Sequence, residues 1–354
     1  MAAPSPLSSL LGGLSLPVPT HALTVLNGNV FGISGFVHRA ARGSTEALVA
    51  VVGLILGGAI GGLIEGGGPQ SSGLSLSELA ASGFLVGFGT KVHASLIIDS
   101  NGRLTSPLIA VQRLHLRAHD LWDCTIFITV SVVGHIPVPD QRTYAHGNMR
   151  PTAPLDWSLR STARKLLVSQ LVPFAVSVLL YLFAPSKPSQ QLAKPEPDTE
   201  TPLKGKPVEL EPQSALRHLA FFSTSTQFAL ALQLSGLADP SRVIRFLLLP
   251  FHEAFDPSLA FLAAGTIPLA MSLYHFALGK EIPRLGGRWS IPKGGKVDWK
   301  LVAGAAIFGI GWGMAGVCPG PGLVNFGHAL VNSDVQLPAM ALWLVALVTG
   351  GLII

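Results

Sequence analysis

Charged residues are scarce in this chain. Only 12% of its 354 residues are Asp, Glu, Lys or Arg, whereas 49% are hydrophobic and the mean hydropathy is +0.49. Soluble domains usually carry about 25% charged residues. The composition therefore argues against an ordinary soluble protein and predicts a membrane protein. The net charge of +5 is small and the basic residues are dispersed, which argues against a nucleic-acid partner.

Cysteine is scarcer still, because the chain has only Cys124 and Cys318. Two cysteines cannot form a disulfide framework. Residues 1–20 contain neither Lys nor Arg, so the basic start of a signal peptide is missing and we interpret this stretch as an N-terminal tail.

Apolar stretches long enough to cross a membrane recur along the chain. A spanning helix needs about 20 mostly apolar residues. Two shorter stretches, 80–90 and 318–331, are rich in Gly or Pro and predict half-helices or re-entrant segments that are buried in protein or line a cavity. We therefore expect an all-α polytopic membrane protein with about eight or nine membrane segments. The expected spans are 21–37, 46–66, 166–184, 216–237, 256–278, 301–317 and 336–354.

A Pro- and charge-rich stretch at 186–215 predicts a flexible linker, which divides the chain into two related halves. VFGISGFVHRA in the first half is similar to ALQLSGLADPS in the second, and FLVGFGTK is similar to IFGIGWGMAG. Basic residues at Arg39 and Arg42, and in the loops 187–217 and 279–300, favour an inverted repeat. Arg242 and Arg245 fall on the wrong side in that arrangement.

The segment GIGWGMAGVCPGPG combines closely spaced glycines with a cysteine. Gly311, Gly313 and Gly316 match a dinucleotide-binding G-x-G-x-x-G pattern, but an apolar span precedes them and prolines follow, so that function is excluded by context. Glycines in a membrane helix instead let another backbone or a small ligand approach closely. For Gly53, Gly57 and Gly61, spaced four residues apart, we expect helix packing.

Cys318 stands at the point where the helix should break. Pro319 and Pro321 lack backbone donors, and Gly320 and Gly322 separate and follow them. A thiol is a weak donor and a soft acceptor, which suits a small sulfur-rich anion better than a hydrated hard ion. A buried, inert cysteine explains the same residue equally well.

GIGWGMAGVCPGPGLVNF resembles the signature of the YeeE/YedE family of sulfur-transport membrane proteins. SGLADPSRVIRFL, followed by FDPSLAFLAAGTIPLAM with Phe255 as its aromatic residue, is similar to the second-half pattern of that family. FGISGFVHRA and GFGTK resemble its first half, so the resemblance covers about 21–91 and 216–354.

The resemblance implies uptake of thiosulfate or a related sulfur anion through a relay of cysteines near the membrane centre, with Cys318 contacting the substrate. It further implies no enzymatic activity, metal or cofactor, and a cytoplasmic sulfur-carrier protein as partner beside the lipid bilayer of the plasma membrane. Gly87 and Gly89 would play the corresponding glycine role in the first half. Lys91 would either attract the anion or extend to the membrane edge.

The first half departs from the family after Lys91, where a second cysteine motif resembling L-S-N-G-C-T-S-G-H-M-x-C-G should follow. Synonymous codons for residues 112–123, read one base later, can encode Asn-Gly-Cys-Thr-Ser-Gly-His-Met-Ile-Cys-Gly. Val92 begins with the intron donor GT, and Ile109 with Ala110 can supply the acceptor AG.

We therefore hypothesise that residues 92–109 are a translated intron. The sequence from residue 110 would then be read out of frame until a point between 125 and 170, which makes 92–165 a mistranslated region. Cys124 would then carry no function, and the apparent metal cluster of His115, His119, His135 and His146 would be accidental. The alternative is a diverged paralogue whose sequence is correct.

Two other functions remain open. A membrane-bound sulfurtransferase or thiol oxidoreductase would use Cys318 as nucleophile, but this chemistry usually needs a base nearby. His328 is ten residues further on, and we expect it on the wrong side of the half-helix; Asp and Glu are absent from 299–333. An inactive membrane partner protein is the third reading.

Overall fold

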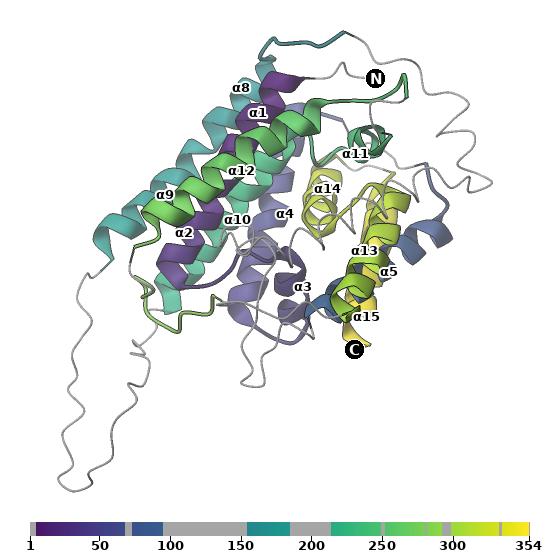
Figure 1. Cartoon of the computed structure of the whole chain (residues 1–354). Coiled ribbons are helices and arrows are strands. Elements are labelled where there is room, and N and C mark those ends of the chain that lie inside the picture. Colours follow the sequence, from purple (N-terminus) through teal and green to yellow (C-terminus); the bar gives the residue numbers. More distant parts are fainter. Residues whose placement is uncertain are drawn as a thin grey trace, which may run out of the picture.

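A computed structural model describes residues 5–67, 73–94, 154–184, 214–248, 252–279, 282–291, 299–332 and 335–353. Within these ranges the regular elements are helices, which confirms the predicted all-α class (Figure 1). Five of the described helical stretches are long and apolar enough to cross a membrane: Pro6–Asn27, Thr45–Glu65, Ser161–Phe183, Ser258–Ala277 and Leu301–Asn332. The chain is a multi-pass membrane protein, and the number of eight or nine segments stays a prediction.

The first span begins earlier than expected. Helices α1 (Pro6–Ser15) and α2 (Pro17–Asn27) follow one another, so 6–20 is helical rather than a tail. Pro17 suits the first turn of α2, where its missing N–H removes no helical bond. Gly28 ends α2 with a left-handed φ of +66°, so the stretch expected as the span 21–37 is divided.

The remaining first-half helices are α3 (Ile33–Ala41), α4 (Thr45–Glu65) and α5 (Leu76–Ala94). Ser44 caps α4 by accepting from the Ala47 N–H at 3.4 Å. Helix α5 has 19 residues and is therefore longer than the half-helix expected at 80–90.

Helices α8 (Ser161–Ser169) and α9 (Leu171–Phe183) form the span that precedes the second half. Residues 185–213, which contain most of the expected linker, lie outside the described residues. The second half then contains α10 (Ser214–Ser235), α11 (Pro240–Leu247), α12 (Ser258–Ala277), α13 (Trp299–Ala315), α14 (Pro319–Asn332) and α15 (Leu337–Leu352).

The two halves repeat one order of elements. A long helix ends at a break, a short helix follows, and then come a long apolar helix and a glycine-rich one; these are α1/α2 to α5 in the first half and α10 to α13 in the second. Helix α4 packs on α10, α12 packs on α1 and α2, and α5 packs on α13. The long apolar helix of each half (α4 or α12) thus packs on the helix that opens the other half (α10, or α1 and α2). This reciprocal packing supports the internal repeat.

Glycines let the halves approach closely. A Cβ on Gly53 would lie 2.8 Å from the Phe222 carbonyl oxygen, and one on Gly57 would lie 2.5 Å from the Ala229 Cβ. The side chain of Gln233 occupies the place of a Cβ on Gly61. The prediction that these three glycines serve helix packing is confirmed.

Arg217 ties several helix ends together. Its side chain is 6% exposed, and its Nε lies 2.7 Å from Glu46 Oε1 in the first turn of α4. It also donates to the Asn27 carbonyl oxygen at 3.2 Å, and to the Gly286 carbonyl oxygen. Arg217 is therefore a structural ion-pair residue and not a loop charge of the kind that sets membrane orientation.

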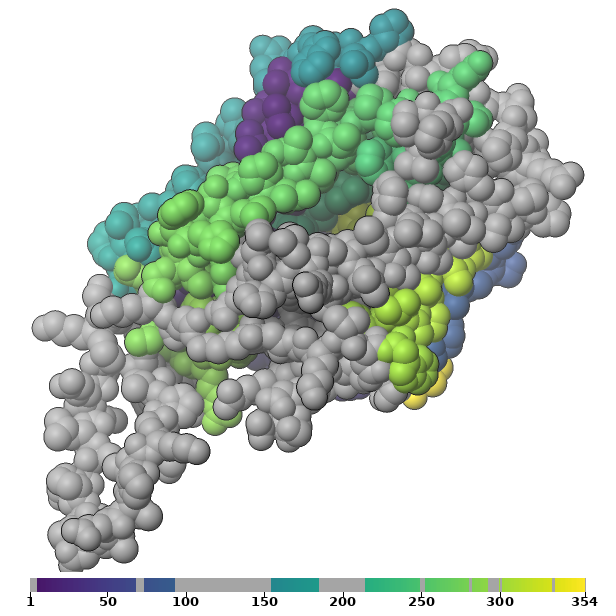
Figure 2. Space-filling view, in the orientation of Figure 1, coloured from purple at the N-terminus to yellow at the C-terminus, as the bar shows by residue number. Residues whose placement is uncertain are grey.

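Helix α12 is covered much less than α4, its counterpart in the repeat. In the most apolar stretch of α12, 17% is buried, whereas the corresponding share in α4 is 44%. Helix α4 also packs against α14. Ile267 and Phe276 are exposed, and Figure 2 shows α12 running along the near face. Within the described ranges, α14 and α15 have no counterparts in the first half.

The hypothesis of a mistranslated region falls mostly on 95–153, which lies outside the described residues; 154–165 form a loop and the first residues of α8. The internal repeat predicts that the gene encodes a further short helix in this region, equivalent to α14 of the second half. Sequencing cDNA across codons 85–180 should therefore show a message without codons 92–109, in which the hidden cysteine motif is in frame. A mature message that keeps these codons would contradict the hypothesis.

Candidate functional site

The Gly-Val-Cys-Pro sequence interrupts a membrane span. Helix α13 ends at Ala315, and Gly316 takes a left-handed φ of +66° while its N–H donates to the Trp312 carbonyl oxygen at 2.7 Å. Helix α14 begins at Pro319, and its first turn closes with the Gly322 N–H donating to the Cys318 carbonyl oxygen at 2.9 Å. The predicted half-helix at 318–331 is confirmed, and Cys318 is the residue that caps it.

Cys318 is a free, half-buried cysteine at the N-terminus of α14. The backbone N–H of Gly320 hydrogen-bonds to its sulfur. Helix N-termini carry a partial positive charge and unpaired N–H groups. The thiol thus lies where a helix end favours a negatively charged or electron-rich partner.

Two other short helices begin at the same place, one from each half. A Cβ on Gly320 would lie 2.8 Å from Cδ1 of Ile33, the first residue of α3, and one on Gly316 would lie 2.6 Å from the carbonyl oxygen of Pro240, the first residue of α11. Asp239 caps α11 by accepting from the Ser241 N–H at 2.9 Å. Gly32 at the start of α3 provides no side-chain cap.

Aromatic side chains pack beside this break. Phe31, just before α3, stacks on Phe228 with a ring separation of 4.6 Å, and Phe36 meets Phe31 edge to face at 5.3 Å. Trp312, in the last turns of α13, has a buried indole N–H without an acceptor in the described part of the chain. The break therefore combines apolar walls with N–H donors.

The glycines and prolines expected at the site fall into two groups. Gly316, Pro319, Gly320 and Pro321 lie at the break with Cys318, and Gly322 follows in α14, where it contacts the ring of Trp343. Gly87, Gly89, Gly311 and Gly313 lie on α5 and α13.

Three of this second group contact neighbouring helices instead of Cys318. A Cβ on Gly311 would lie 2.7 Å from the Ser82 carbonyl oxygen and one on Gly89 2.5 Å from the Phe308 nitrogen, while Gly87 faces the backbone of Leu347. Ser82 joins these helices by donating to the Gly311 carbonyl oxygen and accepting from the Trp343 indole. The structure therefore places Gly87, Gly89 and Gly311 in helix packing, and their role in substrate binding stays a prediction.

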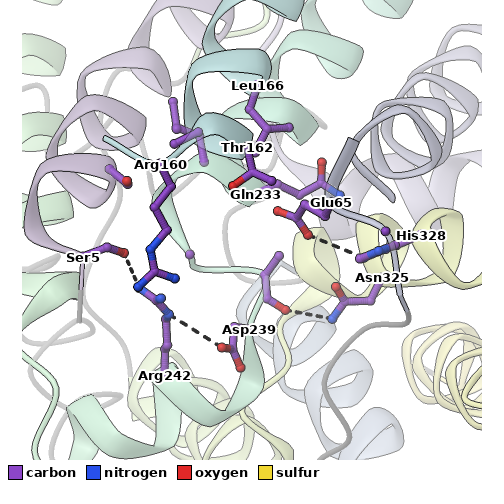
Figure 3. A pocket seen from close by; sticks show the side chains of 16 residues that line it. Ser5, Glu65, Arg160, Thr162, Leu166, Gln233, Asp239, Arg242, Asn325 and His328 are labelled. Atoms are coloured by element: carbon purple, nitrogen blue, oxygen red, sulfur yellow. Dashed lines mark hydrogen bonds and ion pairs between the residues drawn. The ribbon is translucent and has the colours of Figure 1, made fainter. Parts of the chain in front are cut away.

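A polar cavity of about 340 Å³ is a feature that the sequence did not indicate (Figure 3). It lies beside the part of α14 that follows Cys318, where Asn325 and His328 line it. Asp239 and Arg242 of the α11 region line another part of its wall. Arg242 was expected in a loop on the wrong side of the membrane, but its Nη1 donates to Ser5 Oγ at 2.9 Å. The sequence does not reveal this cavity, because its polar residues come one or two at a time from six separate elements.

Comparison with known proteins gives the family. Two proteins of Xylella fastidiosa, from strains Temecula1 and 9a5c, each named "Probable transporter", are 32% identical to this chain over 130 and 128 residues. Each alignment covers 36% of this chain and 86% of the relative. The chain belongs to the family of these proteins. A sequence family described as "Family of unknown function (DUF6691)" matches 217–351, a range that begins within α10, ends within α15 and contains the break at Cys318.

A further Xylella fastidiosa "Probable transporter", from strain 9a5c, is 36% identical over 88 residues, which are 24% of this chain and 65% of the relative. No solved structure matches the chain. The 86% coverage by about 130 residues means that the first two relatives are about as long as one half of this chain.

Proposed function

We propose that this chain is a membrane transporter for thiosulfate or a related small sulfur-containing anion, and that the anion passes Cys318. The observation that carries the proposal is the half-buried thiol of Cys318 at the start of α14, next to the first residues of α3 and α11. Membership of the YeeE/YedE family, a plasma-membrane location and a cytoplasmic sulfur-carrier partner belong to the same proposal.

The geometry suits an anion because positive helix ends meet there. Broken membrane helices whose N-termini face the substrate are a recurrent solution for anionic ligands. The uncapped start of α3 supplies donors without a full positive charge. A full charge would hold a dianion too tightly, whereas transport needs binding weak enough for release.

The thiol suits sulfur in particular. Its S–H is a weak donor and its sulfur is polarisable, so the thiol makes a weak contact with the soft outer sulfur of thiosulfate. It competes poorly with water for strongly hydrated, hard anions. Thiosulfate should therefore be preferred over sulfate. The relatives named transporters and the apolar spans support transport across the membrane.

Uptake by purified protein in liposomes tests this function. Vesicles containing the full chain should accumulate sulfur-labelled thiosulfate faster than empty vesicles, and unlabelled thiosulfate should compete better than sulfate. Uptake equal to that of empty vesicles would contradict the proposal. Consumption of thiosulfate without accumulation would favour the sulfurtransferase.

A further inference from the structure

The polar cavity brings together charged and polar groups from both halves (Figure 3). Glu65 comes from the end of α4, Gln233 from α10 and His328 from α14. Asp239 and Arg242 from the α11 region and Arg160 from the loop before α8 complete its charged groups. Ionisable side chains at membrane depth are rare and commonly serve ion or proton movement.

Two adjacent glycines of α4 make room for this cluster. The Gln233 amide lies against Gly61, in the place that a Cβ would occupy. The His328 ring lies in the same way against Gly62. Since Glu65 is one turn beyond Gly61, the glycine pair seats an amide and an imidazole next to a carboxylate.

Glu65 and His328 form a pair across two helices. Glu65 Oε2 lies 4.0 Å from His328 Nδ1. The His328 side chain is 7% exposed, whereas the Glu65 side chain, which lines the cavity, is 35% exposed. The carboxylate can therefore exchange a proton with cavity water while the imidazole holds its position.

Gln233 offers an acceptor on the other side of this pair. Its Nε2 donates to the Gly58 carbonyl oxygen at 3.1 Å, which fixes the orientation of the amide. The residue is 8% exposed, and its Oε1 lacks a donor within the part of the chain that the structure describes. A carboxylate cannot donate to this oxygen, but a protonated carboxyl group can.

The net charge of the cavity wall depends on whether Glu65 is ionised. Arg242 Nε lies 3.6 Å from Asp239 Oδ2, and Arg160 pairs at 3.2 Å with Asp156 outside the cavity lining. Hydrogen bonds from Ser158 and the charge of Arg160 hold the pKa of the Asp156 carboxyl below its ordinary value, so this pair stays ionised. With Arg160 paired to Asp156, the lining is left with Arg242 against Glu65 and Asp239, and one added proton on Glu65 removes its net negative charge.

We propose that Glu65, beside His328 and Gln233, binds a proton in this cavity and that the proton and the transported anion favour each other's binding. This inference rests on the proposed function. A lining without net negative charge repels an anion less, and a bound anion in turn favours the protonated cavity, because coupling between two sites is reciprocal. Thiosulfate uptake therefore rises as the pH on the cavity side falls.

Uptake of labelled thiosulfate against pH tests the coupling. Between about pH 8 and about pH 6 the full chain in liposomes should gain about fivefold or more in uptake. Glu65→Gln should flatten this profile. Glu78→Gln is the matched control, because Glu78 is an exposed acid whose pKa is lowered by hydrogen bonds from Ser75, and it should keep the gain. A profile in Glu65→Gln as steep as that of the original chain would overturn the proposal.

A second variant keeps the acid and changes only its acceptor. Gln233→Leu removes the oxygen that would accept from protonated Glu65, so the protonated form is less stable and the midpoint of the profile should move to lower pH. An unchanged midpoint would overturn the assigned role of Gln233 and, together with a steep profile in Glu65→Gln, the proton site itself.

Two further measurements separate the proposals. Exchange of labelled for unlabelled thiosulfate at equal pH on both sides measures transport without a proton gradient, and its absence would contradict the proposed function alone. Infrared spectra of the purified chain should show a protonated carboxyl band that appears on acidification and is missing in Glu65→Gln. A band unchanged in this variant would overturn the proton site whether or not transport is seen.

Discussion

Replacing Cys318 by Ser is expected to reduce thiosulfate uptake by about a hundredfold or more, equivalent to about 2.7 kcal/mol. The hydroxyl is smaller and harder than the thiol and loses the soft contact with the anion's sulfur. Serine caps a helix well, so α14 should still begin at Pro319. The loss should therefore appear in uptake measured per folded protein, with little change in thermal stability.

Cys124 provides the matched control, because it is the other cysteine of the chain and lies outside the described residues. Cys124→Ser should leave uptake unchanged. Unchanged uptake in a well-folded Cys318→Ser protein would instead mean that Cys318 is an inert buried cysteine and that the anion does not pass its thiol.

Replacing Gly327 by Leu should separate α14 from α4 and destabilise the protein by about 3 kcal/mol or more. A Cβ at this position meets the Ile55 carbonyl oxygen, and the Ala59 nitrogen would be 3.0 Å away. These are backbone atoms of α4, so no side-chain rotation relieves the overlap. Thermal unfolding in detergent should show a lower Tm, and uptake should fall because α14 carries Cys318 at its start.

Gly35→Leu is the control for this substitution. Gly35 is also a helical glycine, but it is exposed on α3 and nothing lies within 4 Å of a Cβ there. Its Tm should stay the same or rise slightly, because glycine is a poor helix former. Equal unfolding temperatures for both variants would contradict the close packing of α14 on α4.

The break at Cys318 could be predicted because proline and glycine act locally. Pro319 has no N–H for a continuing helix, and Gly316 has the conformational freedom that the end of α13 requires. The packing of Gly53, Gly57 and Gly61 was predictable for the same kind of reason, since a four-residue spacing places them on one helix face.

The first span and the cavity could not be predicted in this way. Proline-containing stretches look like breaks to a hydropathy window, although Pro17 fits the first turn of α2. Glu65 looks like an ordinary polar residue at the end of a span until His328 and Gln233 are brought next to it by packing between halves. Arg242 likewise gave a conflicting orientation signal because it lies on a short helix inside the bundle and not in a loop.

The most direct test of the central claim is whether thiosulfate protects Cys318 from alkylation. In the Cys124→Ser chain Cys318 is the single thiol, so its reaction with a small maleimide can be followed by mass spectrometry. Thiosulfate should slow this reaction in a concentration-dependent way, and sulfate at the same ionic strength should have much less effect. An alkylation rate that is the same with thiosulfate, with sulfate and with neither would contradict the claim that the anion binds at the break before α14.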